Sequence, residues 1–502
     1  MSNRRLLEGL HTILQKMRDV RPVETTQAEL ILQELYQREH LVELIDHYKD
    51  GYALVQAMLA QGGMSALVPS DVVHRFRSLP VRLDENVSWA SARERIFALS
   101  AVGSSLATAA PYPHPQDKDF DSAVSQLLAW EVRAYRLASN ASLQVPAANV
   151  SITAEVVAHA MRQLVPGYED VRIESFEPIL SGVSKTTFSF ATVTARHGRE
   201  EFVARGESLL PILDEVYLGM DLTREYYVVR YLHRAGIKAP EPIALVDDPA
   251  LSSRRFVIYR RVPGRPPGNY LLQIDAISDE LAESVATTLA QLHRVPIDPR
   301  DPDLSRTHIA QHVTHTREDA IRDYLLRAQS YWRDSGAPPS SLVLVALRWC
   351  LENVPVSGKP PCIIHSDCGL NNHLVENDRV TAIVDWETAR LSDPAEDVVW
   401  LMFFTGGVLN EEHFLNCYVR AGGERPDAFA LKYFRVLARV RILLAQVDVQ
   451  IKYEQVRGAN VILCAMALGQ ADKTVAELDA AIREAEQVKR QIQRQPPAWQ
   501  PS

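Results

Sequence analysis

The segment CIIHSDCGLNNHLVENDRVTAIVDWE, residues 362–387, combines two short apolar runs with a dense set of polar side chains. The apolar runs, CII and TAIV, have the composition of short buried strands. Between them lie His365, Asp367 and Asn372, and Asp385 ends the second run. The spacing predicts that Asp367 and Asn372 lie at the two ends of a short loop, with Asp385 on the hairpin that follows. Three oxygen-bearing side chains then face one cleft.

These side chains are of the types that phosphoryl transfer requires. The reaction needs a carboxylate that positions and deprotonates the attacking hydroxyl, and oxygen ligands that hold magnesium against the phosphates. Mg²⁺ is a hard ion that carboxylate and amide oxygens suit. The structural alternative makes Asp367 a loop carboxylate that caps a turn and Asp385 a surface residue at a strand end. The order and spacing of the set follow the protein-kinase catalytic loop and its metal-binding Asp, which favours the chemical interpretation.

Two upstream segments fit the same chemistry. The loop LSGVSKTTF offers Gly182 and Ser184, where backbone N–H groups and hydroxyls can bond phosphate oxygens, although a tight hairpin explains its single glycine equally well. In FVARG, Arg205 ends a strand at the place where a kinase has its phosphate-binding Lys. Glu225 on the next helix is its natural ion-pair partner, and a purely structural contact between strand and helix is an equal alternative.

The periodicity of the chain predicts an α+β protein, in which an N-terminal helical region is followed by a strand-rich region and then by a mostly helical one. Strand-type runs (FEPILSG, TTFSFATVTA, EEFVARG and RRFVIYRRV) are interrupted by one helix, LTREYYVVRYLHRAG, that ends at Gly236. We predict a helical accessory domain over residues 1–138, a linker over 139–151, a strand-rich N-lobe over 152–265 and a helical C-lobe over 266–495. No catalytic set lies in the accessory domain, so packing, oligomerisation or partner contact is its expected role.

Composition narrows the class of protein. The 502 residues are 46% hydrophobic and 23% charged, as in ordinary globular proteins, and carry a formal net charge of -9. Nucleic-acid-binding proteins have a basic stripe, so this balance predicts no nucleic-acid partner. The five cysteines form no C-x-x-C pair. With no continuous apolar stretch for a secretion signal or membrane span, we expect a cytoplasmic protein without a membrane partner.

From about residue 150 to the mid-400s, the chain resembles the aminoglycoside-phosphotransferase-like superfamily, which shares the bilobal eukaryotic-protein-kinase-like fold. The matching pieces, in the family's order, are LSGVSKTTF, FVAR, REYYVVRYL, FVIYRRVPGR, LAQLHRV, IIHSDCGLNNHLV and IVDWETARLSDPAEDVVWL. The resemblance implies ATP and Mg²⁺ as cofactors, Asp367 as catalytic base, and Asn372 and Asp385 as metal ligands. It also implies a supporting role for His365, which orients the catalytic loop, and a bracing role for Asp397. The segment that contains Tyr259, Arg261 and Val262 becomes the adenine-binding hinge.

The chain departs from the family pattern at two positions. Arg205 stands where many members have Lys, which keeps the charge but offers a planar fork in place of a point charge. Ser366 follows the catalytic His where the family usually has Gly. Serine fits the bend unless the backbone there needs a positive φ.

The acceptor is less well defined than the reaction. The run DWETARLSDPAEDVVWL looks closer to the acyl-CoA-dehydrogenase-associated phosphotransferases, which implies a hydroxyacyl-CoA or a related hydroxy compound as the small-molecule alcohol. The alternatives are an aminoglycoside-type antibiotic phosphotransferase and a catalytically weak kinase-like binding protein that acts through its N-terminal domain. The basic segment RVLARVRILLAQVDVQIKYEQVR can sit on a CoA phosphate or form an ordinary core helix. A homo-oligomer or a protein partner bound through the helical domain is also compatible with the sequence.

Overall fold

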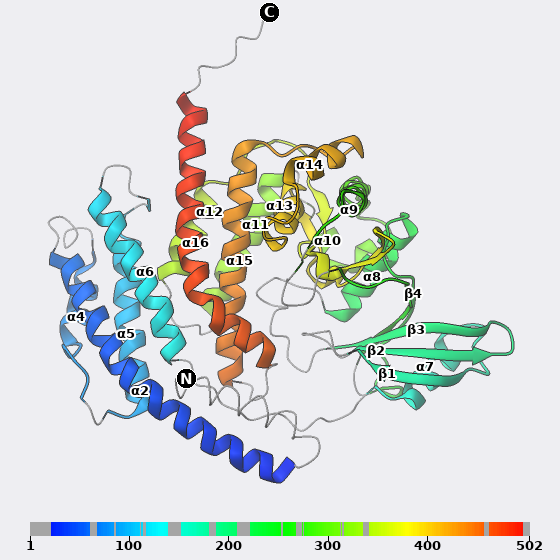
Figure 1. The fold of residues 1–502 in the computed structure, drawn as a ribbon, viewed down its shortest axis with the longest axis horizontal. Helices are drawn as coiled ribbons and strands as arrows, with labels where there is room; N and C mark the ends of the chain where they lie inside the picture. Colours follow the sequence, from blue (N-terminus) through cyan, green and yellow to red (C-terminus); the bar gives the residue numbers. More distant parts are fainter. Residues whose placement is uncertain are drawn as a thin grey trace, which may run out of the picture. The chain divides into compact units, whose positions relative to one another are not determined.

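The computed structural model describes residues 22–60, 68–84, 87–110, 112–113, 117–138, 152–179, 187–207, 221–252, 255–267, 274, 276–311, 313, 316–334, 341–455 and 461–494 (Figure 1). The predicted linker over residues 139–151 lies outside them, as does the phosphate-loop candidate over residues 180–186. In this part of the chain, no helix is both long enough and apolar enough to cross a membrane.

The contacts within the chain group its residues into two compact units. One takes residues 1–147, 332–352 and 439–486, and the other takes residues 148–331, 353–438 and 487–502. This grouping places two segments of the predicted C-lobe with the N-terminal helices. The predicted domain boundaries therefore stay a prediction.

The first unit is helical, and the predicted N-terminal helical region is confirmed. Its N-terminal helices are α2 (Pro22–Ala60), α4 (Ser70–Ser78), α5 (Trp89–Ala107) and α6 (Lys118–Ala138). The distant helix α12 (Ser341–Glu352) packs against both α5 and α6. A buried polar contact accompanies this packing, since the Ser341 hydroxyl donates to the Ser104 hydroxyl at 3.0 Å and lies 3.3 Å from the Glu131 carboxylate.

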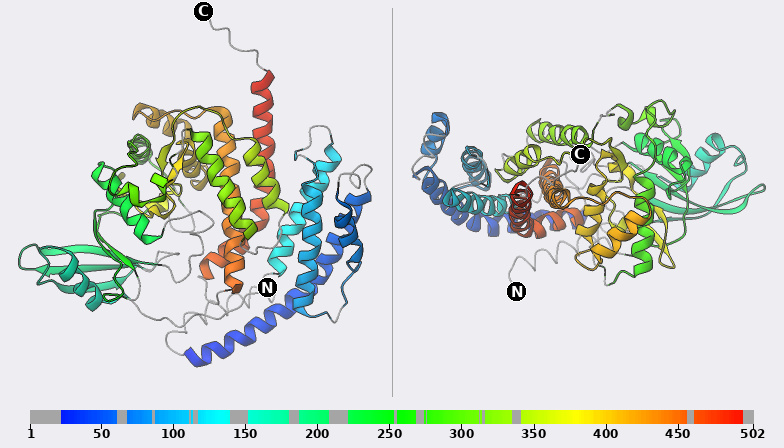
Figure 2. Two further views of the ribbon diagram at one scale, coloured as in Figure 1. Left: turned by 180° about the vertical axis from the view of Figure 1, so that it is seen from behind. Right: turned by 90° about the horizontal axis from the view of Figure 1, so that it is seen from above.

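The second unit contains a five-stranded antiparallel sheet in the order β1-β2-β3-β5-β4. Its strands are β1 (Arg172–Pro178), β2 (Thr187–Thr194), β3 (Gly198–Gly206), β4 (Pro242–Val246) and β5 (Phe256–Arg260). Helix α7 (Ala154–Leu164) lies against one face, as Figure 1 and both views of Figure 2 show. Its buried residues join Phe190, Phe202 and Phe256 of the strands in one hydrophobic core.

The alternation of side chains along β3 and β5 separates this core from the opposite face. Ala204 and Ile258 are paired in register and belong to the core under α7. Successive residues of a strand point to opposite faces, so Val203, Arg205 and Tyr259 point away from α7. Helix α8 (Leu222–Arg234) packs against β4 and β5. The face that carries Arg205 is therefore the face that meets α8.

Glycine makes the connection from the sheet to the helical lobe possible. After β5, Arg265 pairs with Val375 through two backbone hydrogen bonds of 3.0 Å. The neighbouring Gly264 has φ +113°, and a Cβ there would lie 2.9 Å from the Val375 carbonyl oxygen. A side chain at this position would be strained and would clash with backbone, so glycine is required. The crossing segment is thereby fixed to the hairpin that follows the catalytic loop.

The remaining elements form the helical lobe, except for residues 332–334 of α11, 439–455 of α15 and 461–486 of α16, which the contacts group with the first unit. The remaining elements are α9 (Asp279–Leu292), η1 (Leu304–Arg306), α10 (His308–Gln311), α11 (Arg317–Asp334), β6 (Cys362–Ile364), η2 (Leu370–Asn372), β7 (His373–Glu376), β8 (Arg379–Ile383), η3 (Trp386–Thr388), β9 (Arg390–Ser392), α13 (Ala395–Phe404), α14 (Glu411–Arg420), α15 (Ala428–Gln455) and α16 (Val461–Arg494). An antiparallel sheet lobe followed by a helical lobe confirms the predicted α+β, two-lobed class.

Candidate active site

The carboxylate of Asp367 is held by two donors, one on each oxygen. The amide nitrogen of Asn372 donates to Oδ2 at 3.0 Å and to the Asp367 carbonyl oxygen at 2.8 Å. The indole nitrogen of Trp400 donates to Oδ1 at 2.9 Å. Asp367 follows β6 and Asn372 ends η2, so the two residues do lie at the ends of a short loop.

His365 connects this loop to the strand end that carries Asp385. Its Nε2 lies 2.9 Å from the Val384 carbonyl oxygen, and its Nδ1 accepts from the Asp367 backbone N–H at 3.2 Å. The ring is fully buried, and burial lowers the pKa of His365 below its ordinary value. A neutral ring that donates through Nε2 and accepts through Nδ1 satisfies both contacts. The predicted supporting role of His365 fits these contacts.

Asp397 fixes the backbone of the same loop. It accepts from the backbone N–H groups of His365 at 2.8 Å and Ser366 at 2.7 Å, and its Oδ2 lies 3.1 Å from His293 Nε2. Burial raises the pKa of this fully buried carboxyl, but the hydrogen bond from His293 and the other donors outweigh it and hold the pKa at about 2. Asp397 is therefore an ionised brace for the turn before Asp367.

The backbone at Ser366 is left-handed, with φ +71°. The sequence left open whether the bend requires a positive φ, and it does. Glycine is the residue that adopts this conformation without steric cost, so the serine strains the turn. The turn persists because Asp397 and the neighbouring contacts fix it.

Arg205 binds three carboxylates. It forms the predicted ion pair with Glu225 at 3.4 Å, a closer one with Asp385, and a longer one with Glu387 at 3.6 Å. Burial alone lowers the pKa of the guanidinium, but Asp385, Glu225 and Glu387 outweigh it, so the pKa lies well above its ordinary value. A planar fork can meet several carboxylates at once, which a lysine ammonium does less well. The sheet, α8 and the catalytic hairpin meet at this one side chain.

The donor set fits a magnesium ion. The backbone N–H of Val384 donates to the Asn372 carbonyl oxygen at 2.9 Å, which brings Asn372 beside the strand end that precedes Asp385. Asn372 donates through its amide nitrogen to Asp367, and its Oδ1 accepts from the Asn371 side-chain amide at 3.1 Å. The side chain of Asp385 pairs with Arg205 and is 27% exposed. One amide oxygen and one accessible carboxylate are hard ligands of the kind Mg²⁺ takes beside substrate phosphates. Among the described residues, no group of three or more His, Cys, Asp or Glu residues forms a site by protein ligands alone.

The remaining predicted residues divide into three cases. Tyr259 is buried in β5 on the face of Arg205, and its hydroxyl has no hydrogen-bond partner in the described chain. Arg261 turns its side chain outward to Glu201 at 2.9 Å, so only its backbone stays at the crossing segment, where Val262 is half-buried. Gly182 and Ser184 lie outside the described residues.

Sequence reasoning missed two contacts of the site. Glu387 follows Asp385 by two residues, but its approach to Arg205 depends on the turn η3. Trp400 lies on α13, and nothing in the spacing of the motif indicates its contact with Asp367. The available signal was that Trp400 lies in the segment IVDWETARLSDPAEDVVWL, which begins just before Asp385 and matches the family pattern.

The sequence model of the APH phosphotransferase enzyme family matches residues 175–441, just over half of the chain. The chain belongs to this family. The match includes Arg205, the catalytic-loop segment and α13, so the family's members, which are phosphotransferases, share the region that forms the candidate site.

Relatives and solved structures agree with this assignment. Acyl-CoA dehydrogenase family member 11 of Rattus norvegicus is 24% identical over 235 residues, which cover 45% of this chain and 27% of the rat protein. The Gallus gallus protein of that name is 27% identical over 232 residues, with the same two shares. The chain thus matches less than a third of the length of these relatives. A crystal structure from Ralstonia eutropha, provisionally assigned as an aminoglycoside phosphotransferase, aligns at 19% identity with a TM-score of 0.50, covering 67% of this chain and 98% of that one. That likeness confirms the fold of the APH family.

Proposed function

We propose that the protein is an ATP-dependent small-molecule kinase that transfers the γ-phosphoryl group to an alcohol. The observation that carries the proposal is the carboxylate of Asp367, fixed by Asn372 and Trp400 at the end of a braced loop. Membership of the phosphotransferase family supports the reaction class. A carboxylate so held is suited to orienting a hydroxyl and accepting its proton.

In the proposed reaction, Asp367 receives the proton of the acceptor hydroxyl as the oxygen attacks the γ-phosphorus. The bond from phosphorus to the bridging oxygen breaks, ADP leaves with that electron pair, and the proton passes from Asp367 to solvent. Mg²⁺ held by Asn372 and Asp385 would neutralise charge on the phosphates. Arg205 would exchange part of its contact with Asp385 for phosphate oxygens, while Glu225 keeps the guanidinium aimed into the site.

For the acceptor, we propose a hydroxyacyl-CoA or a related hydroxy compound. The relatives named acyl-CoA dehydrogenase family member 11 support this branch over the antibiotic phosphotransferases. The basic segment considered for a CoA phosphate lies in α15, whose residues up to 445 are largely buried. There Arg435 pairs with Glu411 at 2.7 Å, and Arg439 lies 3.6 Å from Glu477. The core-helix interpretation of this segment therefore fits better. A cytoplasmic location and a partner for the N-terminal helices stay predictions.

ATP turnover with magnesium tests the proposal. Purified protein is assayed against hydroxyacyl-CoAs, sugars, amino alcohols and aminoglycosides, with Asp367→Asn beside the wild type. We expect turnover that depends on one acceptor class and falls about 100-fold or more in the variant, the scale of general-base catalysis. Asp378→Asn is the matched control, because this exposed residue makes the same chemical change in the β7–β8 turn, at a φ of 57° that asparagine tolerates. Equal rates in Asp367→Asn and Asp378→Asn would remove Asp367 from the mechanism.

A further inference from the structure

Trp400 contacts the proposed catalytic base from helix α13, to which the sequence analysis assigned no site residue other than the bracing Asp397. It lies in the last part of α13 and is 3% exposed, and its indole N–H reaches Oδ1 of Asp367 across a sequence separation of 33 residues. Buried indole nitrogens find a partner. Here the partner is the one carboxylate on which the proposed chemistry depends.

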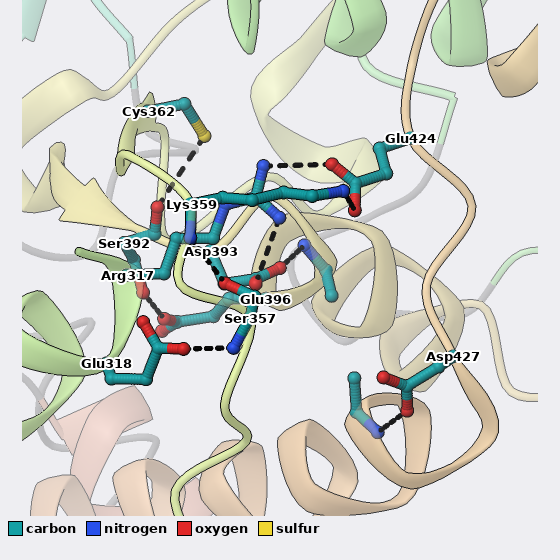
Figure 3. A network of polar contacts seen from close by, with 12 residues as sticks. Arg317, Glu318, Ser357, Lys359, Cys362, Ser392, Asp393, Glu396, Glu424 and Asp427 are labelled. Carbon is teal, nitrogen blue, oxygen red and sulfur yellow. Dashed lines mark hydrogen bonds and ion pairs between the residues drawn. The ribbon is translucent and has the colours of Figure 1, made fainter. Parts of the chain in front are cut away.

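The helix that carries Trp400 is anchored at its beginning. Asp393 accepts from the Ala395 backbone N–H at 2.8 Å and thereby caps the first turn of α13. Arg317 holds Asp393 at 3.3 Å and Glu424 at 3.0 Å, and Lys359 reaches Glu424 at 2.6 Å. Figure 3 shows Arg317 between these two carboxylates. The start of α13 is therefore tied to α11 and to the loop after α14.

The same helix also holds the backbone of the catalytic loop. Asp397 lies three residues before Trp400, on the adjacent turn, and accepts from the backbone of His365 and Ser366. The Trp400 ring itself packs against Phe404, with 4.8 Å between ring centroids. One anchored helix thus fixes the loop backbone through Asp397 and the Asp367 side chain through Trp400.

We propose that Trp400 is a positioning residue that sets the rotation of the Asp367 carboxylate for phosphoryl transfer. The inference rests on the proposed function and adds to it a residue that acts through Asp367. Asn372 and Trp400 each hold one carboxylate oxygen, so rotation about the Cβ–Cγ bond breaks both hydrogen bonds. Indole is a donor only, so it cannot take the substrate proton and leaves that task to Asp367.

Replacement by phenylalanine removes the donor and keeps most of the ring packing. Asn372 still donates to the other oxygen. With one of the two hydrogen bonds removed, the carboxylate samples more orientations in which it does not meet the hydroxyl, and small errors in the placement of a catalytic group cost up to about 100-fold in rate. Because Trp400 is buried behind Asp367, the KM for Mg-ATP should stay within about threefold while kcat falls about 10-fold to 100-fold.

Trp349→Phe is the matched control. Its indole is 2% exposed and donates to the Glu486 carboxylate at 3.0 Å, in the other compact unit. Both variants lose one buried hydrogen bond from an indole to a carboxylate, so both should lower the melting temperature by similar amounts. Only Trp400→Phe should lower kcat.

The assay uses water as the probe acceptor, because ATP hydrolysis needs no identified alcohol. Its bond changes are those of the transfer to an alcohol, with a water oxygen as nucleophile. We expect kcat to fall in Trp400→Phe and to stay unchanged in Trp349→Phe. In the double variant that combines Trp400→Phe with Asp367→Asn, we expect kcat to be no lower than in Asp367→Asn alone. Unchanged kcat in Trp400→Phe, equal losses in both tryptophan variants, or additive losses with Asp367→Asn would overturn the positioning role alone. Absence of Mg-ATP turnover by the wild type, with water and with every alcohol, would overturn the proposed function as well.

Discussion

At Ser366, the backbone conformation is one that favours glycine, although the residue carries a side chain. Its φ of +71° favours glycine, its side chain is 1% exposed, and its hydroxyl has no hydrogen-bond partner among the described residues. Left-handed backbone costs a non-glycine residue about 1–2 kcal/mol, and a glycine returns about 0.5–1 kcal/mol of that as chain entropy. We therefore expect Ser366→Gly to raise the free energy of unfolding by up to about 1 kcal/mol, measured by urea denaturation.

Ser366→Ala separates the two causes of this effect. Alanine removes the buried hydroxyl and keeps the strain, so its gain reports only the unpaired oxygen. If Ser366→Gly is less stable than Ser366→Ala, the left-handed backbone at residue 366 does not lower the free energy of unfolding by a significant amount.

For single residues, the sequence predicted which polar side chains lie around the loop and hairpin better than it predicted their contacts. The order of Asp367, Asn372 and Asp385 sufficed to place them around one loop and hairpin. It also predicted that Arg205 pairs with Glu225, because a strand-end cation and a helix carboxylate are natural partners. The contact of Arg205 with Asp385 joins residues 180 positions apart, and it depends on how the sheet meets the catalytic hairpin. Motif spacing contains no such information.

At the scale of elements, α13 makes the stability of the catalytic loop depend on pH. The folded-state pKa of Asp397 is about 2, below the ordinary value of 3.8, so its ionisation stabilises the fold above pH 4 and loses that effect as the pH falls toward 2. The shift corresponds to about 2 kcal/mol. Asp397→Asn should therefore be less stable than the wild type by an amount that is constant above about pH 5 and shrinks between pH 4 and pH 2.

Urea unfolding of both proteins at pH 6, 4 and 3 measures this difference. Asp378→Asn provides the comparison for an exposed aspartate on the neighbouring hairpin. A difference between wild type and Asp397→Asn that does not change with pH would mean that the carboxyl is not ionised in the folded loop.

The failure to predict one strand from the sequence has a physical explanation. Strand β4, Pro242–Val246, was absent from the predicted meander because Pro240 and Pro242 interrupt its pattern. Proline is tolerated there because β4 is an edge strand, paired with β5 alone. In contrast, helix α8 and the strands β2, β3 and β5 have uninterrupted periods, and all were predicted within a few residues of their ends.

At the scale of the whole molecule, the helical unit is not made of N-terminal residues alone. Residues 332–352 and 439–486 group with residues 1–147, and α12 packs against α5 and α6. Arg348 of α12 donates to the Thr108 carbonyl oxygen at 3.1 Å, while Val343, Leu347 and Trp349 are buried. Such pairings link segments more than 200 residues apart, which periodicity cannot predict. The predicted accessory domain over residues 1–138 stays a prediction, and the contact grouping adds residues 332–352 and 439–486 to the same unit.

A truncated chain that begins at residue 148 tests whether the helical unit consists of N-terminal residues alone, as predicted, or also requires residues 332–352 and 439–486. If the accessory domain folds separately, the truncated protein keeps the melting temperature and Mg-ATP turnover of the full chain. We expect instead that it loses stability and binds a hydrophobic dye, because α12 loses its cover and each exposed large apolar side chain costs about 1.5–3 kcal/mol. Residues 1–147 co-expressed as a separate polypeptide should then bind the truncated chain and restore its melting temperature. A truncated chain that is monomeric, binds no dye and melts as the full chain does would show that α12 needs no N-terminal helices, and the predicted boundary near residue 139 would stand.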